Sequence, residues 1–269
     1  MSVIDRGAGT PVIVVPGIQG RWEWHGPAID TLASRCRVIT FSFIDETQTA
    51  KIRDDQVRVD LYCQQILEVM AEAGLESACL CGISYGGLVA AAFAARYPER
   101  ITSLVLVSAL SPHWRPDGRV TTYLRYPRLL TPLFLAASLR LFAEIRTATP
   151  TFWRAVVSGT RHARTALSHM FSPTRMARRA SQLAGNRLGS EVSTIAVHTL
   201  IIVGEPELDR VVPVENTVTY AGLINHSRVV TLNRTGHLGS VTKPHSFAEL
   251  VVSFAQGNEN LRDSRRRLG

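Results

Sequence analysis

The chain alternates short apolar runs with longer segments in which apolar residues recur at helical spacing. Several of the short runs are apolar at consecutive positions, which is typical of strands buried on both faces of a parallel sheet. The sequence predicts six such strands, at residues 11–15, 37–41, 78–82, 101–108, 198–203 and 227–232.

The segments between these runs carry the pattern of amphipathic helices. Val59, Cys63, Ile66 and Met70 recur at i, i+4, i+7 and i+11, and the pattern ends near Gly74. Two further helices are predicted at residues 85–97 and at residues 247–254, the latter ending at Gly257. Strands that alternate with helices predict an α/β fold, with a mostly parallel, doubly wound sheet and helices on both of its faces.

One region breaks this alternation. Between residues 111 and 191 no segment has the pattern of a strand, and three stretches separated by prolines have that of helices, at residues 129–145, 151–171 and 173–188. We therefore expect a helical cap at residues 111–190, inserted into an α/β core formed by residues 1–110 and 191–257. Residues 258–269 are expected to form a basic, flexible tail.

The predicted cap is rich in arginine. It contains thirteen arginines, opposed only by Asp117 and Glu144, whereas the whole chain has a net charge of +8. A solvated basic surface is the simpler explanation, because no recognition helix or RNA-binding motif accompanies the charge. No nucleic-acid partner is therefore expected.

The first helix of the predicted cap is unusually apolar. We expect its side chains to pack on the rest of the cap and over the substrate pocket; the alternative is a wall that binds an acyl chain. Membrane contact is not expected, although an arginine-flanked apolar helix could lie on an anionic surface. The apolar residues are Leu129, Leu130, Leu133, Phe134, Leu135, Leu139, Leu141 and Phe142.

Length and composition limit the remaining classes of protein. A chain of 269 residues with 45% hydrophobic and 19% charged residues fits one large α/β unit and excludes a disordered or fibrous protein. The cysteines are too few for a disulfide scaffold and lack zinc-ligand spacing, so no metal is expected. No apolar run has the length of a secretion signal or a membrane span, which predicts a cytoplasmic protein. The cysteines are Cys36, Cys63, Cys79 and Cys81.

The most informative motif is Gly-Ile-Ser-Tyr-Gly-Gly at residues 82–87, between a predicted strand and a predicted helix. In this context G-x-S-x-G is a nucleophile elbow, in which the flanking glycines let strand and helix approach closely. The hydroxyl of Ser84 would then project over the amino end of a helix, whose dipole favours developing negative charge. The alternative is a tight turn with a solvent-facing serine.

A serine hydroxyl needs a base, and the base needs an acid to orient it. Among the histidines, His237 lies in a glycine-flanked loop after the last predicted strand; His25 and His113 could also line the site. The segment after the strand at residues 198–203 offers three carboxylates, which are Glu205, Glu207 and Asp209.

With the order Ser84, Asp209, His237, the chain resembles the α/β-hydrolase superfamily over nearly its whole length, and the insertion lies where that family carries its cap. Counting three residues from Gly204, as the family's usual spacing implies, gives Glu207 as the acid. Counting back from Val-Val-Pro at residues 211–213, which resembles the family's D-x-V-x-P ending, gives Asp209. We favour Asp209, with Glu207 and then Glu205 as alternatives.

The resemblance also implies an oxyanion hole formed by the backbone N–H groups of Ile18 and Tyr85. Pro16 stands where the family usually has a histidine, but backbone donors do not depend on that side chain. We expect Gln19, Trp22 and Trp24 to border the substrate. The alternative is that the two tryptophans anchor the loop on the core.

Together these residues predict a serine carboxylesterase that works through an acyl-enzyme intermediate on a small-molecule ester, without cofactor or metal, as a monomer or homodimer. Because the nucleophile is Ser84, the chemistry of the related dehalogenases and epoxide hydrolases, which use aspartate, is not expected. Hydrolysis of a carbon–carbon bond in a diketone, lactone opening and acyl transfer use similar triads and stay open. So does a small-molecule receptor built on this scaffold.

Overall fold

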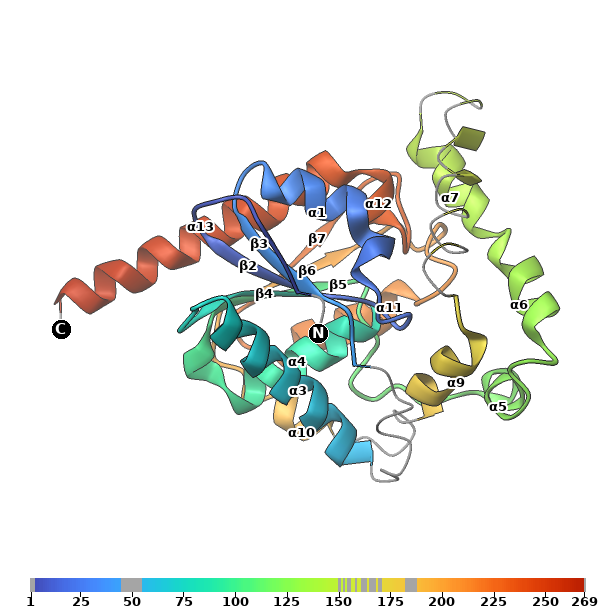
Figure 1. The fold of residues 1–269 in the computed structure, drawn as a ribbon, viewed down its shortest axis with the longest axis horizontal. Coiled ribbons are helices and arrows are strands. Elements are labelled where there is room, and N and C mark those ends of the chain that lie inside the picture. The colour runs from blue at the N-terminus through green and yellow to red at the C-terminus, as the bar shows by residue number, and fades with distance from the viewer. Residues whose placement is uncertain are drawn as a thin grey trace.

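The centre of the molecule is a twisted sheet (Figure 1). The structure, a computed structural model, describes residues 3–44, 55–149, 171–181 and 188–268, and residues 151, 153, 156, 157, 159, 160, 164 and 168. Within this part of the chain the seven strands have the order β1-β3-β2-β4-β5-β6-β7, and all neighbours are parallel except β1 and β3. The strands are β1 (Val3–Arg6), β2 (Pro11–Val15), β3 (Arg37–Phe41), β4 (Ala78–Ile83), β5 (Ile101–Val107), β6 (Thr199–Val203) and β7 (Ser227–Thr231).

All six predicted strands are present, each within one residue of its predicted ends. The additional strand is β1, a short antiparallel edge whose last two residues are exposed. Arg37 in β3 donates to the carboxylate of Asp5 in β1 at 2.6 Å. A strand of four residues that is half polar has no run of apolar positions, so the sequence pattern does not predict it.

Helices cover both faces of the sheet (Figure 1). Because adjacent residues in a strand point to opposite faces, the consecutive apolar positions divide between two clusters. Val12 and Cys79 belong to the cluster with α1 and α13, whereas Ile13 and Leu80 belong to the cluster with α3 and α4. The α helices of the core are α1 (Gly26–Ala33), α3 (Asp55–Glu72), α4 (Tyr85–Arg96), α10 (Leu188–Val192), α11 (Val214–Val218), α12 (Gly239–Thr242) and α13 (Pro244–Leu268), and the 3-10 helices are η1 (Trp22–His25), η2 (Pro98–Arg100) and η3 (Thr219–Gly222).

The last helix is longer than predicted. The pattern places its end at Gly257, but α13 continues to Leu268 and projects from the body of the molecule (Figure 1). A glycine inside a helix costs only about 1 kcal/mol, so Gly257 does not have to end the helix. One residue further on, the Asn258 side chain donates to the Phe254 carbonyl of the preceding turn at 2.8 Å. None of the helices in the described part of the chain is long and apolar enough to cross a membrane.

The described part of the region between β5 and β6 is helical, as predicted, and most of it lies to one side of the sheet (Figure 1). We refer to residues 111–190 as the cap segment. The helix predicted at residues 129–145 is in fact two helices, broken near Arg140, and most of the helix predicted at residues 151–171 lies outside the described residues. The helices of the cap segment are α5 (Gly118–Arg125), α6 (Thr131–Ser138), α7 (Leu141–Ala148) and α9 (Pro173–Ser181).

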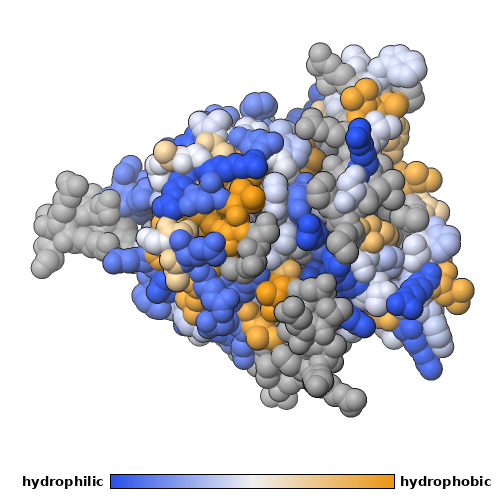
Figure 2. All heavy atoms as spheres, in the orientation of Figure 1, coloured by the Kyte–Doolittle hydropathy of each residue, from blue (hydrophilic) through white to orange (hydrophobic). Residues whose placement is uncertain are grey.

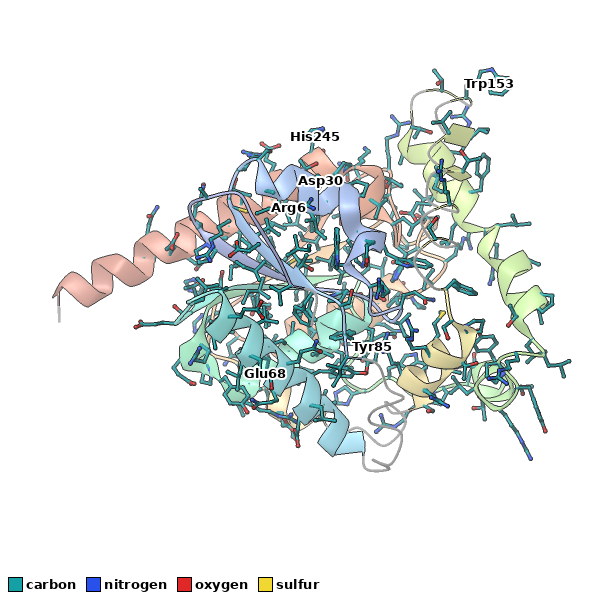
Figure 3. The ribbon with its side chains drawn as sticks, in the orientation of Figure 1. Arg6, Asp30, Glu68, Tyr85, Trp153 and His245 are labelled. Carbon is teal, nitrogen blue, oxygen red and sulfur yellow. The ribbon has the colours of Figure 1, made fainter. Side chains whose placement is uncertain are left out.

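The expectation that this apolar stretch packs over the pocket is wrong for its three most exposed members. The exposed fractions of Leu129, Leu133 and Leu139 are 76%, 67% and 75%, and Figure 2 shows apolar side chains along the outer edge of the cap segment. The break near Arg140 separates this exposed face from α7, which instead buries Glu144 and Ile145. Figure 3 shows another exposed side chain of the cap segment, Trp153, at its tip. The side chains of Phe134 and Leu135 lie outside the described residues.

Candidate active site

Ser84 occupies the sharp turn between β4 and α4. Its backbone has φ of 56° and ψ of −119°, a conformation that a residue with a side chain adopts only when the surrounding structure enforces it. Its N–H donates to the Val107 carbonyl of β5 at 2.8 Å. The side chain therefore stands at the carboxyl edge of the sheet, above the amino end of α4, as the elbow motif predicts.

His237 reaches Ser84 from the loop that follows β7. Its Nε2 atom lies 3.1 Å from Ser84 Oγ, which is hydrogen-bonding distance. This loop approaches the loop after β6 closely at Gly236. A Cβ atom on Gly236 would lie 2.4 Å from the Leu208 carbonyl. The glycine before His237 thus allows the base to approach the segment that carries the carboxylates.

Asp209 is the carboxylate that lies beside His237. Its Oδ1 atom is 3.4 Å from His237 Nδ1, and the same oxygen accepts the N–H groups of Val211 and Val212 at 3.1 and 2.9 Å. Burial by itself raises the pKa of this carboxyl, but His237 and the two N–H groups outweigh burial, so that its pKa is lowered. The group is therefore an anion at neutral pH.

The two alternative acids lie elsewhere. Glu207 is exposed to solvent. Glu205 accepts the backbone N–H of Arg234 at 2.6 Å. It so fastens the loop between β7 and α12, residues 232–238, to the loop after β6; we call residues 232–238 the histidine loop. The two extra residues in this loop, compared with the usual family spacing, are the reason that the count from Gly204 points to Glu207.

The loop after β2 lies against Ser84. A Cβ atom on Gly17 would lie 3.7 Å from Ser84 Cβ, and the loop closes as a turn in which the Gly20 N–H donates to the Gly17 carbonyl at 2.8 Å. His25 holds this turn, because its Nε2 accepts the Gly17 N–H at 3.3 Å. Ile18 is in this turn, and Tyr85, labelled in Figure 3, is the first residue of α4, directly after Ser84. Both predicted oxyanion residues therefore lie at the edge where Ser84 stands.

The side chains predicted to border the substrate have different surroundings. Trp22 packs on the cluster beneath α1 and α13, with the Arg6 guanidinium over its ring at 5.7 Å, which matches the anchoring alternative. Trp24 lies next to Phe171 of the cap segment, with ring centroids 6.3 Å apart. Gln19 is buried, and its Oε1 lies 3.5 Å from the Ser172 N–H. Trp24 and Gln19 thus connect the loop to the cap segment.

Sequence reasoning missed two buried charged residues of the cap segment. Arg179 in α9 is 1% exposed and donates to the Ile18 carbonyl at 2.7 Å, and its guanidinium lies over the Phe43 ring at 5.2 Å. Glu144 in α7 is fully buried and accepts the Leu238 N–H at 2.7 Å. Glu144 is one of two acids in the cap segment and is next to the apolar Ile145, and this pattern could have been used to infer its burial. Nothing in the pattern distinguishes Arg179 from the other arginines.

The burial of Glu144 predicts an unusual dependence of stability on pH. Desolvation raises the pKa of this carboxyl from 4.5 to about 7. The folded protein therefore binds the proton more tightly than the unfolded chain, so the free energy of unfolding should fall as pH rises from 4.5 to about 7 and level off above. In Glu144→Gln, whose side chain does not titrate, this fall should be absent.

The measurement is urea unfolding at a series of pH values across this window, with Glu207→Gln, an exposed glutamate, as the matched control. We expect the control to follow the wild type. An equal decline in the wild type and in Glu144→Gln would show that Glu144 is not its source.

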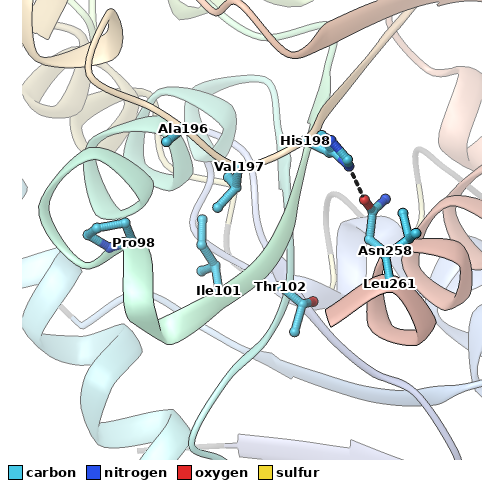
Figure 4. A pocket seen from close by; sticks show the side chains of 8 residues that line it. All are labelled: Pro98, Ile101, Thr102, Ala196, Val197, His198, Asn258 and Leu261. Atoms are coloured by element: carbon cyan, nitrogen blue, oxygen red, sulfur yellow. Dashed lines mark hydrogen bonds between the residues drawn. The ribbon is translucent and has the colours of Figure 1, made fainter. Parts of the chain in front are cut away.

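A pocket of about 250 Å³ lies away from this site. Figure 4 shows it between the start of β5 and α13, with His198 hydrogen-bonded to Asn258. Ile101 and Thr102 begin β5, and residues 196–198 come directly before β6, so the pocket lies at the amino edge of the parallel strands, whereas Ser84 follows β4 at the carboxyl edge. The lining residues are Pro98, Ile101, Thr102, Ala196, Val197, His198, Asn258 and Leu261.

Comparison with known proteins shows the family to which the chain belongs. Residues 10–244 match the model of the alpha/beta hydrolase fold, and the chain belongs to this family and is a hydrolase of the α/β fold. It is 28% identical, over 93% of its length and 90% of the relative's, to 2-hydroxy-6-oxo-2,4-heptadienoate hydrolase of Pseudomonas putida. The solved meta-cleavage product hydrolase CumD of Pseudomonas fluorescens IP01 superposes with a TM-score of 0.65 at 25% identity, over 94% and 92% of the two chains. The esterase EaEST of Exiguobacterium antarcticum, at 22% identity and a TM-score of 0.75 over 94% of each chain, shares the fold.

Proposed function

We propose that the protein is a serine hydrolase in which Ser84 is the nucleophile, His237 the general base and Asp209 the acid that orients the imidazole. The observation that carries this proposal is the line of contacts from Ser84 Oγ to His237 Nε2, at 3.1 Å, and from His237 Nδ1 to Asp209 Oδ1, at 3.4 Å. A nucleophile, a base and a group that holds the base are what acyl transfer to a serine requires.

The reaction has two halves. Ser84 Oγ bonds to the substrate carbonyl carbon while its proton moves to His237 Nε2, and the electron pair of the carbonyl double bond moves to oxygen. When that intermediate collapses, the leaving group takes the proton from His237 and departs, leaving an acyl group on Ser84. Water, deprotonated by the same imidazole, then attacks the acyl carbon. As the bond between that carbon and Ser84 Oγ breaks, the proton passes from His237 to Oγ, which releases a carboxylic acid and free Ser84.

The backbone N–H groups of Ile18 and Tyr85 are the oxyanion donors in this proposal. The loop that carries Ile18 lies against Ser84, and Arg179 fixes the same residue by binding its carbonyl. Tyr85 begins α4, whose amino end carries positive partial charge. A preorganised donor of this kind is worth about 3 kcal/mol of transition-state stabilisation.

Carboxylic esters are the first substrate class. Their alcohol leaves after one proton transfer from His237, so the groups named above complete the reaction without another residue, a cofactor or a metal. Trp24, Gln19 and the cap segment border the substrate in this proposal, because they meet beside the loop of Ile18.

A carbon–carbon bond in a diketo acid is the second substrate class, and a specific observation favours it. The Pseudomonas putida relative is named for a 2-hydroxy-6-oxo-dienoate, a carboxylate with a ketone at its far end. Arg179 places a buried positive charge next to the loop of Ile18, and such a charge would favour an anionic substrate.

The test is turnover of p-nitrophenyl esters from acetate to laurate, and of a 2-hydroxy-6-oxo-dienoate, by the wild type, Ser84→Ala and Ser103→Ala. Ser103 is a fully buried serine of β5 and serves as the matched control. Wild-type turnover should fall at least about 10³-fold in Ser84→Ala and stay unchanged in Ser103→Ala. The substrate that is turned over decides between the two classes, and full activity in a folded Ser84→Ala protein would exclude the mechanism.

A further inference from the structure

Glu144 is a fully buried acid that the mechanism above does not use. It comes from α7 of the cap segment, and its Oε1 atom accepts the N–H of Leu238, the residue that follows His237. The second oxygen, Oε2, is also buried and has no hydrogen-bond partner in the described part of the chain. Burying a carboxyl with one oxygen unsatisfied costs stability, so its position needs an explanation.

The same helix contacts the histidine loop at a second point. The Arg234 side chain donates to the Thr147 carbonyl near the end of α7 at 2.8 Å. Arg234 precedes His237 and Leu238 follows it, so α7 is fastened to the loop on both sides of the imidazole. The cap segment is therefore hydrogen-bonded to the histidine loop at two points.

We propose that Glu144 is a positioning residue for His237, which acts in two ways. Its hydrogen bond to the Leu238 N–H fixes the backbone that aims the imidazole at Ser84. Its negative charge, in the ionised form, stabilises the imidazolium that His237 becomes when it accepts the proton of Ser84. The inference rests on the proposed function, because it assigns Glu144 to the base of that reaction.

Four groups that face Glu144 affect its ionisation. His237 faces it from the histidine loop and favours its ionisation, Asp209 faces it from the loop after β6 and opposes it, and the N–H groups of Gly236 and Leu238 favour it. Burial outweighs the favourable contacts, and the pKa of Glu144 is about 7. Arg234 carries the other charge at this contact, and its guanidinium is bonded to the Thr147 carbonyl.

Coupling between two titrating groups is reciprocal. Because the charge of His237 lowers the pKa of Glu144, the ionised Glu144 carboxylate must in turn favour the imidazolium. Asp209 remains ionised throughout the neutral range, since its pKa is lowered, so the change in negative charge beside the imidazole near pH 7 comes from Glu144.

A purely structural anchor makes a different prediction. Glu144→Gln keeps a carbonyl oxygen for the Leu238 N–H but has no charge, so it preserves the anchor and removes the coupling. Glu144→Ala removes both. A structural anchor would leave the activity of Glu144→Gln unchanged at every pH, whereas the proposed role would lower it where the wild-type carboxyl is ionised.

The experiment is a ¹³C NMR titration of the Glu144 carboxyl in the resting enzyme. In His237→Gln, which removes the facing charge, we expect this carboxyl to titrate at higher pH than in the wild type, where its pKa is about 7. In His245→Gln, the matched control, the midpoint should stay at the wild-type value, because His245 is an exposed residue of α13. An unchanged Glu144 midpoint in His237→Gln would overturn the proposal.

Steady-state kinetics give a second readout. In Glu144→Gln kcat should fall about tenfold with KM unchanged above pH 7, where the wild-type carboxyl is ionised, and this loss should shrink as pH falls below 7. No loss, or a loss of the same size at every pH, would overturn the proposed link to the reaction.

The test separates failure of this inference from failure of the proposed function. The NMR titration needs no substrate, so it reports the coupling even if none of the esters or the dienoate is turned over. If Glu144→Gln does not fold, the titration still tests the proposal, because it compares only the wild type with the histidine variants.

Discussion

In Asp209→Asn we expect kcat to fall by at least about 10³ with little change in KM and with the fold retained. The carboxylate is 1% exposed and its lowered pKa keeps it charged, so in the proposed mechanism it stabilises the imidazolium at the moment of proton transfer. Asparagine has nearly the same shape and can still accept the N–H groups of Val211 and Val212, but it is neutral. Circular dichroism and steady-state kinetics on the substrate identified by the turnover test would measure the effect.

The matched control is Glu207→Gln, the same loss of charge two residues earlier in the loop. Because Glu207 is exposed, its kcat should remain within about twofold of the wild type. The pair also tests the identity of the acid, since the family spacing counted from Gly204 points to Glu207. A large loss of kcat in Glu207→Gln together with an active Asp209→Asn would reverse the assignment.

In Gly86→Ala we expect the free energy of unfolding to fall by about 3 kcal/mol. A Cβ atom at Gly86 would lie 2.4 Å from the carbonyl oxygens of both Val15 and Pro16, which are backbone atoms at the end of β2. Alanine is the better helix former by about 1 kcal/mol, but steric overlap with fixed backbone outweighs that gain. Relief would require α4 and the loop of Ile18 to separate, so activity should fall as well.

Gly257→Ala is the control for this steric argument. Gly257 lies inside α13, and a Cβ atom there would meet nothing within 4 Å. The same substitution should leave stability unchanged or raise it by up to about 1 kcal/mol. Urea denaturation of the two variants measures the difference, and equal midpoints for Gly86→Ala and the wild type would contradict the close packing of α4 on β2.

The cap segment shows where pattern reasoning reaches its limit. Its helical character follows from the sequence, but the direction in which each helix faces does not. Leu129 and Leu133 have the spacing of a buried stripe and are exposed, whereas Glu144 and Arg179 are charged and buried. A short helix with apolar residues on several sides does not specify which side it buries, because its partners come from distant parts of the chain.

The sequence by itself determined the α/β alternation, the strand positions and the elbow at Ser84. These features depend on local rules: burial on both faces makes a strand uniformly apolar, and a tight strand–turn–helix junction needs its glycines. It also singled out His237 by the glycines beside it. Each of these signals lies within a few residues of the feature it predicts.

The tertiary structure alone decided which groups meet. It placed Asp209 beside His237 and left Glu207 in solvent, and it brought Glu144 and Arg179 from the cap segment to the two loops that flank Ser84. These contacts join residues about 30 to 160 positions apart, and their energies depend on burial and on the charged residues of other elements. No periodicity along the chain encodes such a meeting, because it is set by how the sheet, the loops and the cap pack together.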